Sequence, residues 1–128
     1  MNRFITLGLT LLAGVAIGAA AINGLNAQGA ASGAYAVVDI AEVSNPDLFK
    51  ALLAKAEPPV TAFGGKFIVR TESTVGLDGN APKRFVVIGF DSVEKAKAWD
   101  ASPAQQEIDA MRSKSTKSRS FIADGKTN

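Results

Sequence analysis

The segment RFVVIGF at 84–90 constrains the fold more than any other part of the chain. A strand that is buried on one face only alternates apolar and polar residues. Here Phe85 and Val87 point to one face, and the residues between and after them point to the other, yet both sets are apolar. The segments AYAVVDI at 34–40 and KFIVR at 66–70 share this property. The sequence therefore predicts a sheet that needs cover on both of its faces.

Turn and capping signals divide the chain between residues 34 and 125 into one small α+β domain. Strands are predicted at 34–43, 66–75, 84–90 and 117–124, and helical segments at 47–63, 91–101 and 103–113. The order is strand, helix, strand, strand, a helix broken in two, and strand. This order is typical of the ferredoxin-like split βαβ fold, an antiparallel four-stranded sheet with its helices on one face. Residues 126–128 are expected to form a tail.

Three capping signals support the helix assignments. Ser44 or Asn45 precedes a proline at the start of the first helix, an arrangement typical of a helix N-terminus. Asp91 and Glu94 have the spacing of a capping box for the second helix. Ser102, followed by a proline, predicts the start of the third. Pro58 and Pro59 are expected to interrupt the first helix.

Helices on one face leave the other apolar face of the sheet uncovered. A monomer would expose several hundred Å² of apolar sheet, roughly the size at which a surface patch marks an interaction site. A second copy of the chain is the simplest cover for it. We therefore expect a homodimer that forms through the sheet face.

The N-terminal residues have the layout of an export signal. Arg3 precedes an uncharged apolar run at 4–22, and small polar residues follow it. We interpret residues 1–27 as a signal peptide and residues 28–33 as a linker, which predicts a periplasmic or secreted protein. The alternative is an uncleaved inner-membrane anchor formed by residues 4–22. Membrane contact is expected only through this leader.

Composition excludes several chemistries. The chain contains no His and no Cys, which excludes Ser-His-Asp and Cys-His nucleophiles, His-ligated zinc, iron–sulfur clusters and disulfides. Its acidic residues lack the spacing of a calcium loop. The sequence predicts neither a metal site nor a cofactor. A formal charge of +2 gives no electrostatic case for binding nucleic acid.

Asp39 is the candidate catalytic or polar binding residue. It lies in the middle of an apolar strand, where an ionised carboxylate needs a partner. Arg70 and Arg84 on neighbouring strands are the candidate partners, and such a pair at a cleft can orient a polar ligand or tune a base. The alternative is a structural ion pair.

Aromatic residues are the candidates for the apolar wall of a ligand pocket between helices and sheet. These are Tyr35, Phe63, Phe67 and Trp99, and their alternative role is ordinary core packing. The basic residues between Arg112 and Arg119 are interpreted as a solvated face.

From Ala34 to Gly125 the chain resembles the domain of unknown function 1330 (DUF1330) family, within the dimeric α+β barrel superfamily. The resemblance rests on YAVVDI, on PPVTAFGGKFIVR at 58–70, on RFVVIGFDSVEKAKAW at 84–99, and on Ser102-Pro103. It implies a ferredoxin-like homodimer. It also implies relatives that include cofactor-independent monooxygenases, haem-using barrels and ligand-binding proteins, so it transmits no single activity. The leader departs from most members, and the lack of His excludes haem held through that residue.

Three hypotheses of function follow. The first is an exported homodimer that binds a small, partly apolar ligand, with Asp39 and Arg70 fixing its polar end. The second is a cofactor-independent oxygenase or isomerase-like enzyme with Asp39 as base and Trp99 shaping the pocket. The third is a structural, envelope-associated oligomer without a ligand. The sequence leaves open whether the protein is an enzyme.

Overall fold

The computed structural model describes residues 33–125. The predicted leader, nearly all of the linker and the tail lie outside these residues. The elements follow one another as β1 (Ala34–Val43), α2 (Pro46–Lys55), α3 (Glu57–Ala62), β2 (Lys66–Thr71), β3 (Arg84–Phe90), α4 (Val93–Ala101), α5 (Pro103–Ser115) and β4 (Thr116–Asp124). Within residues 33–125 no helix has the length and apolar character that crossing a membrane requires.

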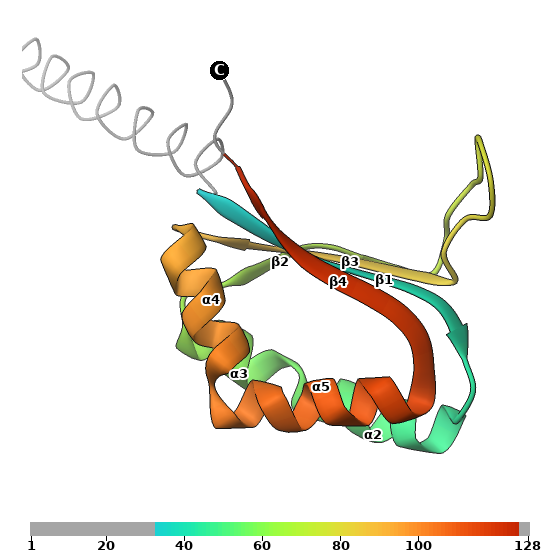
Figure 1. The fold of residues 1–128 in the computed structure, drawn as a ribbon, viewed down its shortest axis with the longest axis horizontal. Helices are drawn as coiled ribbons and strands as arrows, with labels where there is room; N and C mark the ends of the chain where they lie inside the picture. Colours follow the sequence, from blue (N-terminus) through green and yellow to red (C-terminus); the bar gives the residue numbers. More distant parts are fainter. Residues whose placement is uncertain (1–32, 126–128) are drawn as a thin grey trace, which may run out of the picture. The chain divides into compact units, whose positions relative to one another are not determined.

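The four strands form one antiparallel sheet in the order β2-β3-β1-β4. In Figure 1 the helices of residues 33–125 lie together on one face of this sheet, and no element of the same residues covers its outer surface. The α+β ferredoxin-like fold predicted from the order of elements is confirmed.

Side-chain caps begin three of the helices. The Leu48 backbone N–H donates to Asn45 Oδ1 at 3.1 Å, as predicted for α2. The Lys95 N–H donates to Ser92 Oγ at 3.1 Å, so the cap of α4 is Ser92 rather than the predicted Asp91. Ser102 caps α5 as predicted. The break between α2 and α3 falls at Ala56, because the prolines belong to the first turn of α3, where a missing N–H costs no helical hydrogen bond.

The second strand is shorter than predicted. It ends at Thr71 rather than at residue 75, because the Ser73 N–H donates to Thr71 Oγ1 at 2.9 Å and the chain turns out of the sheet. Residues 72–83 form a long connection to β3, which projects on the side of the sheet away from the helices (Figure 1). Val75 and Leu77 in this connection are 84% and 98% exposed.

The core lies between the helices and the inner face of the sheet. Alternate residues of β1 and β3 point toward the helices and are buried, whereas their neighbours are only partly buried. The core consists of Ala34, Ala36, Val38, Ile40, Phe49, Leu52, Val60, Val86, Ile88, Phe90, Ala96, Trp99 and Ile108.

The outer face of the sheet carries an apolar row that crosses all four strands. Strand register pairs Val69 with Val87, Val87 with Val37, and Val37 with Phe121. We call these four residues the outer row. Phe121 is 49% exposed, and no element of residues 33–125 covers this face in Figure 1. The structure thus shows the two-sided apolar sheet that the strand pattern predicts.

Candidate functional site

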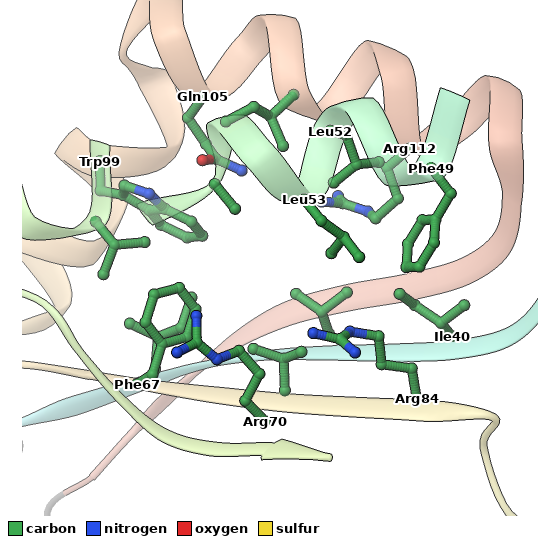
Figure 2. Close-up of a pocket in the computed structure, with 16 residues that line it drawn as sticks. Ile40, Phe49, Leu52, Leu53, Phe67, Arg70, Arg84, Trp99, Gln105 and Arg112 are labelled. Carbon is green, nitrogen blue, oxygen red and sulfur yellow. The ribbon is translucent and has the colours of Figure 1, made fainter. Parts of the chain in front are cut away.

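A cavity of about 280 Å³ lies between the helices and the inner face of the sheet. This volume is near the lower end of the range of ligand pockets, roughly 300–1,000 Å³. Most of the lining is apolar, and the polar part consists of Gln105, Arg70, Arg84 and Arg112 (Figure 2). The apolar lining residues are Val38, Ile40, Phe49, Leu52, Leu53, Ala56, Val60, Phe67, Val86, Ile88, Trp99 and Ile108.

Strand alternation supplies the floor of the cavity. Arg84 pairs with Ile40 and Val86 pairs with Val38, so these four side chains point to the same face. All four line the cavity. The floor therefore places one cationic side chain at the edge of an aliphatic surface.

A bulge in β2 adds Phe67 and Arg70 to the same face. The register shifts between Phe67 and Val69, so that Phe67 pairs with Ile88 and Arg70 pairs with Val86. Residues three apart would point to opposite faces of a regular strand, but the extra residue brings both toward the helices. The Arg70 guanidinium carbon lies 4.2 Å from the centre of the Phe67 ring, a cation–π contact.

Arg84 combines a nearly buried side chain with an incomplete set of hydrogen bonds. Its side chain is only 15% exposed, and its Nη1 lies 3.3 Å from Oε2 of Glu72, a side chain that is 70% exposed. Its Nε is buried and has no hydrogen-bond partner among the described residues. A buried N–H without an acceptor is costly, which makes this atom a candidate contact for a ligand.

Arg112 enters the cavity from α5 and is held by neighbouring side chains. Its Nη1 lies 2.9 Å from Asp109 Oδ1, and its Nη2 donates to Ser120 Oγ at 3.3 Å. Gln105 Nε2 also donates to Asp109 Oδ1, at 3.1 Å. Arg112 therefore adds positive charge to the cavity, while its hydrogen-bond donors are largely occupied.

A second carboxyl group lies behind this network. Burial raises the pKa of Asp100, and a hydrogen bond with Asp109 and the negative charge of Asp109 raise it further. The charge of Arg112 acts in the opposite direction. Asp100 thus lies against Asp109 at the junction of α4 and α5, next to the arginine that lines the cavity.

Trp99 lines the end of the cavity opposite Phe49 and Arg84 (Figure 2). Its ring packs on Phe90 with 5.2 Å between ring centres, and the residue is 5% exposed. The indole N–H is buried without an acceptor in the described part of the chain. The cavity lining therefore contains two buried donors that lack partners, Trp99 Nε1 and Arg84 Nε.

Four of the predicted site residues meet in this cavity: Phe67, Arg70, Arg84 and Trp99. Phe63 packs against the core beside it but does not line it. Tyr35 lies on the outer face, since its neighbours Ala34 and Ala36 are the residues that point to the helices.

The predicted pairing of Asp39 with Arg70 or Arg84 is wrong. Asp39 also lies on the outer face, where its Oδ2 is 3.3 Å from Nε of Arg119. The register explains this, because Val38 and Ile40 point inward and the residue between them must point outward. The structure does not bring Asp39 into the cavity.

Two of the four polar lining residues, Gln105 and Arg112, were not predicted from the sequence. Arg112, interpreted as part of a solvated face, is 14% exposed at its side chain, and Gln105 is 3% exposed. Their spacing from Ile108 is helical, so all three share the inner face of α5. This spacing is the sequence feature from which Gln105 and Arg112 could have been placed in the cavity. Among residues 33–125 no cluster of acidic side chains is arranged to hold a metal ion.

The fold and the cavity define a ferredoxin-like α+β protein with an amphipathic internal pocket. More narrowly, residues 33–126 match the family described as Domain of unknown function (DUF1330), and the chain belongs to that family. No curated protein matches the chain.

Solved structures share the fold. A protein of unknown function from Rhodopseudomonas palustris has 16% identity and a TM-score of 0.57, over 73% of this chain and 82% of that one. A dimeric protein of unknown function with a ferredoxin-like fold, from Bacteroides fragilis, has 7% identity and a TM-score of 0.50, over 71% and 94%. SnoaB, a cofactor-independent oxygenase from Streptomyces nogalater, has 13% identity and a TM-score of 0.47, over 74% and 94%.

Proposed function

We propose that the protein is a homodimer that binds a small, partly apolar molecule in the cavity between its helices and its sheet. The observation that carries the proposal is the lining of that cavity. Apolar walls with a few convergent polar groups are typical of small-molecule sites. Here the polar groups include two buried donors, on Arg84 and Trp99, that lack acceptors among the described residues.

The homodimer is supported by the outer row. Val37 and Val87 lie on the two central strands and are only partly buried, and Phe121 beside them on β4 is half exposed. Packing of two such faces gives a core about 10 Å thick between the sheets. The similar protein from Bacteroides fragilis is described as dimeric.

Export remains part of this proposal and rests on the sequence of residues 1–27 alone. Cell fractionation with mass analysis of the N-terminus tests it. We expect a periplasmic or secreted protein that lacks the leader. An intact N-terminus in the membrane fraction would favour the anchor formed by residues 4–22, and an intact cytosolic protein would contradict export.

A variant that fills the cavity tests the binding function. Leu53 extends from α2 into the cavity and is 37% exposed, so a larger side chain there needs little rearrangement of the core (Figure 2). We expect small-molecule extracts of the source cells to raise the thermal midpoint of the natural protein, since a ligand of the folded state stabilises it. Leu53→Phe should abolish that rise, whereas Leu77→Phe in the exposed connection should keep it.

Two results would contradict the binding function. One is that no extract stabilises the natural protein, which would favour a structural role without a ligand. The other is that Leu53→Phe and the natural protein are stabilised equally, which would place binding elsewhere on the molecule.

A further inference from the structure

We propose that the ligand of the cavity is a carboxylate with an apolar body, and that its two oxygens bind the edge of Arg84 formed by Nε and Nη2. The inference rests on the proposed function, because it names the chemical class of molecule that the cavity takes. It is carried by the arrangement of the Arg84 donors and by the charges around the cavity.

The guanidinium of Arg84 has two edges that can bind a carboxylate in two places at once. The edge that holds Nη1 faces Glu72, whose Oε2 lies 3.3 Å away. The other edge consists of Nε and Nη2, whose N–H bonds point in parallel to the side of the group opposite Cδ. Its Nε is buried without an acceptor among the described residues, and no hydrogen bond of Nη2 is found there. One bidentate edge of a nearly buried guanidinium therefore has no acceptor in residues 33–125.

The charges of the lining favour an anion at this edge. Three arginines and no acidic residue line the cavity in the described part of the chain. Arg112 is neutralised at 2.9 Å by Asp109. Arg70 lies 3.8 Å from Glu57, but its own side chain is 45% exposed and therefore stays largely solvated. The acid that pairs with Arg84 is 70% exposed and therefore well screened by water. Arg84 is thus the cavity cation with the least compensation for its burial.

The surroundings of Arg84 fit an apolar body attached to the carboxylate. Figure 2 shows its guanidinium extending from the sheet toward the helices, with Leu53 and Phe49 on the helix side. Ile40 lies beside it in strand register. A planar carboxylate matches a single fork of two donors.

A pair of probes that differ in charge alone tests the inference. Cyclohexanecarboxylate and neutral cyclohexanecarboxamide have nearly the same shape, and both leave tryptophan fluorescence unobscured. Trp99 is the only tryptophan of the chain and lines the cavity, so its emission reports occupancy. For the full-length natural protein at pH 7.5, we expect the carboxylate to bind at least about tenfold more tightly than the amide, as a charge-assisted bidentate contact implies.

Arg84→Lys keeps the positive charge and removes the two-donor edge. We expect it to weaken carboxylate binding about tenfold and to change amide binding by less than about threefold. The matched control is Arg119→Lys on the outer face, which should change neither. Circular dichroism establishes that each variant is folded, and the comparison of the two probes in the natural protein needs no variant.

The outcomes separate the two proposals. Equal binding of the two probes, tighter binding of the amide, or carboxylate binding that Arg84→Lys leaves intact would each overturn the carboxylate assignment and leave the cavity a ligand site. If neither probe changes Trp99 emission at millimolar concentration, the cavity does not take small molecules of this size, and the proposed function falls with the inference.

Discussion

Three arginines enter one cavity, and their neighbours give each a different role. Arg70 covers the ring of Phe67, Arg112 is held by Asp109, and Arg84 keeps a buried donor without an acceptor in residues 33–125. Charge alone does not distinguish them, because all are cations at neutral pH. Their hydrogen bonds do distinguish them, because Arg84 is the one of the three with a buried donor that lacks an acceptor in residues 33–125. A ligand that accepts hydrogen bonds therefore gains most from Arg84.

Asp100 makes the folded protein sensitive to pH. Because burial and the neighbouring Asp109 raise the pKa of Asp100 above the ordinary value of 3.8, the folded state binds its proton more tightly. Its contribution to stability therefore falls as pH rises from 3.8 through the raised pKa, and at neutral pH its charge is destabilising. Asp100→Asn should raise the free energy of unfolding at pH 7 by up to about 1 kcal/mol and should flatten its decline over that window.

Urea unfolding at a series of pH values measures this effect. Asp78→Asn, in the exposed connection between β2 and β3, is the matched control and should leave the profile unchanged. A lower stability of Asp100→Asn at pH 7 would show that the carboxylate of Asp100 stabilises the fold.

The position of Asp39 in the structure reverses the effect that its sequence context predicts for a substitution there. Since its carboxylate lies on the outer face beside Arg119, Asp39→Ala should leave ligand affinity in the cavity within about twofold of the natural value. Titration of the same ligand against both proteins measures the ratio. A loss of tenfold or more would mean that Asp39 acts on the cavity after all.

At the scale of elements, the junction of α4 and α5 positions one wall of the cavity. Ser102 Oγ donates to the Trp99 carbonyl oxygen at 2.7 Å and accepts from the Gln105 N–H at 3.3 Å. One hydroxyl therefore ends the helix that carries Trp99 and begins the helix that carries Gln105, and both residues line the cavity.

Removal of this hydroxyl should weaken the fold. Ser102→Ala is expected to lower the free energy of unfolding by about 1 kcal/mol, the usual effect of losing an N-cap. Guanidinium unfolding followed through Trp99 fluorescence measures it. The control is Ser113→Ala at an exposed position of α5, which should change stability by less than about 0.5 kcal/mol. Equal values for both would show that the cap is dispensable.

Element order and most caps could be predicted from the sequence, because Asn45, Ser102 and the prolines act locally. The sequence does not reveal which side chains of each strand point toward the helices. AYAVVDI is apolar at both alternations, so the pattern leaves open whether Val38 or Asp39 points to the helices, and a shift of one residue reverses the answer. Likewise the bulge that brings Arg70 inward depends on pairing with β3, which no local signal reveals.

At the scale of the whole molecule, the outer row links the fold to its assembly. Phe121 lies at one end of this row, on an edge strand, and is half exposed in the single chain. A charge there costs the monomer little but would be buried in a dimer formed through the sheet. Phe121→Lys should therefore shift the protein to monomers and raise the dimer dissociation constant by at least about a hundredfold.

Sedimentation velocity at micromolar concentration follows this shift. Leu77→Lys is the matched control, because Leu77 is 98% exposed and lies in the connection outside the sheet. It should sediment as the natural protein does. Dimers that survive Phe121→Lys unchanged would show that association uses another surface.

Two copies of the chain are proposed to form an assembly whose helix–sheet cavities hold a small molecule. Native mass spectrometry of the protein purified from its own cells tests it most directly, because a single spectrum reports both subunit number and retained compounds. We predict the mass of two chains plus a small molecule that is lost when the protein is unfolded. Single chains would contradict the proposed homodimer, and pairs of chains with no added mass would contradict the proposed ligand.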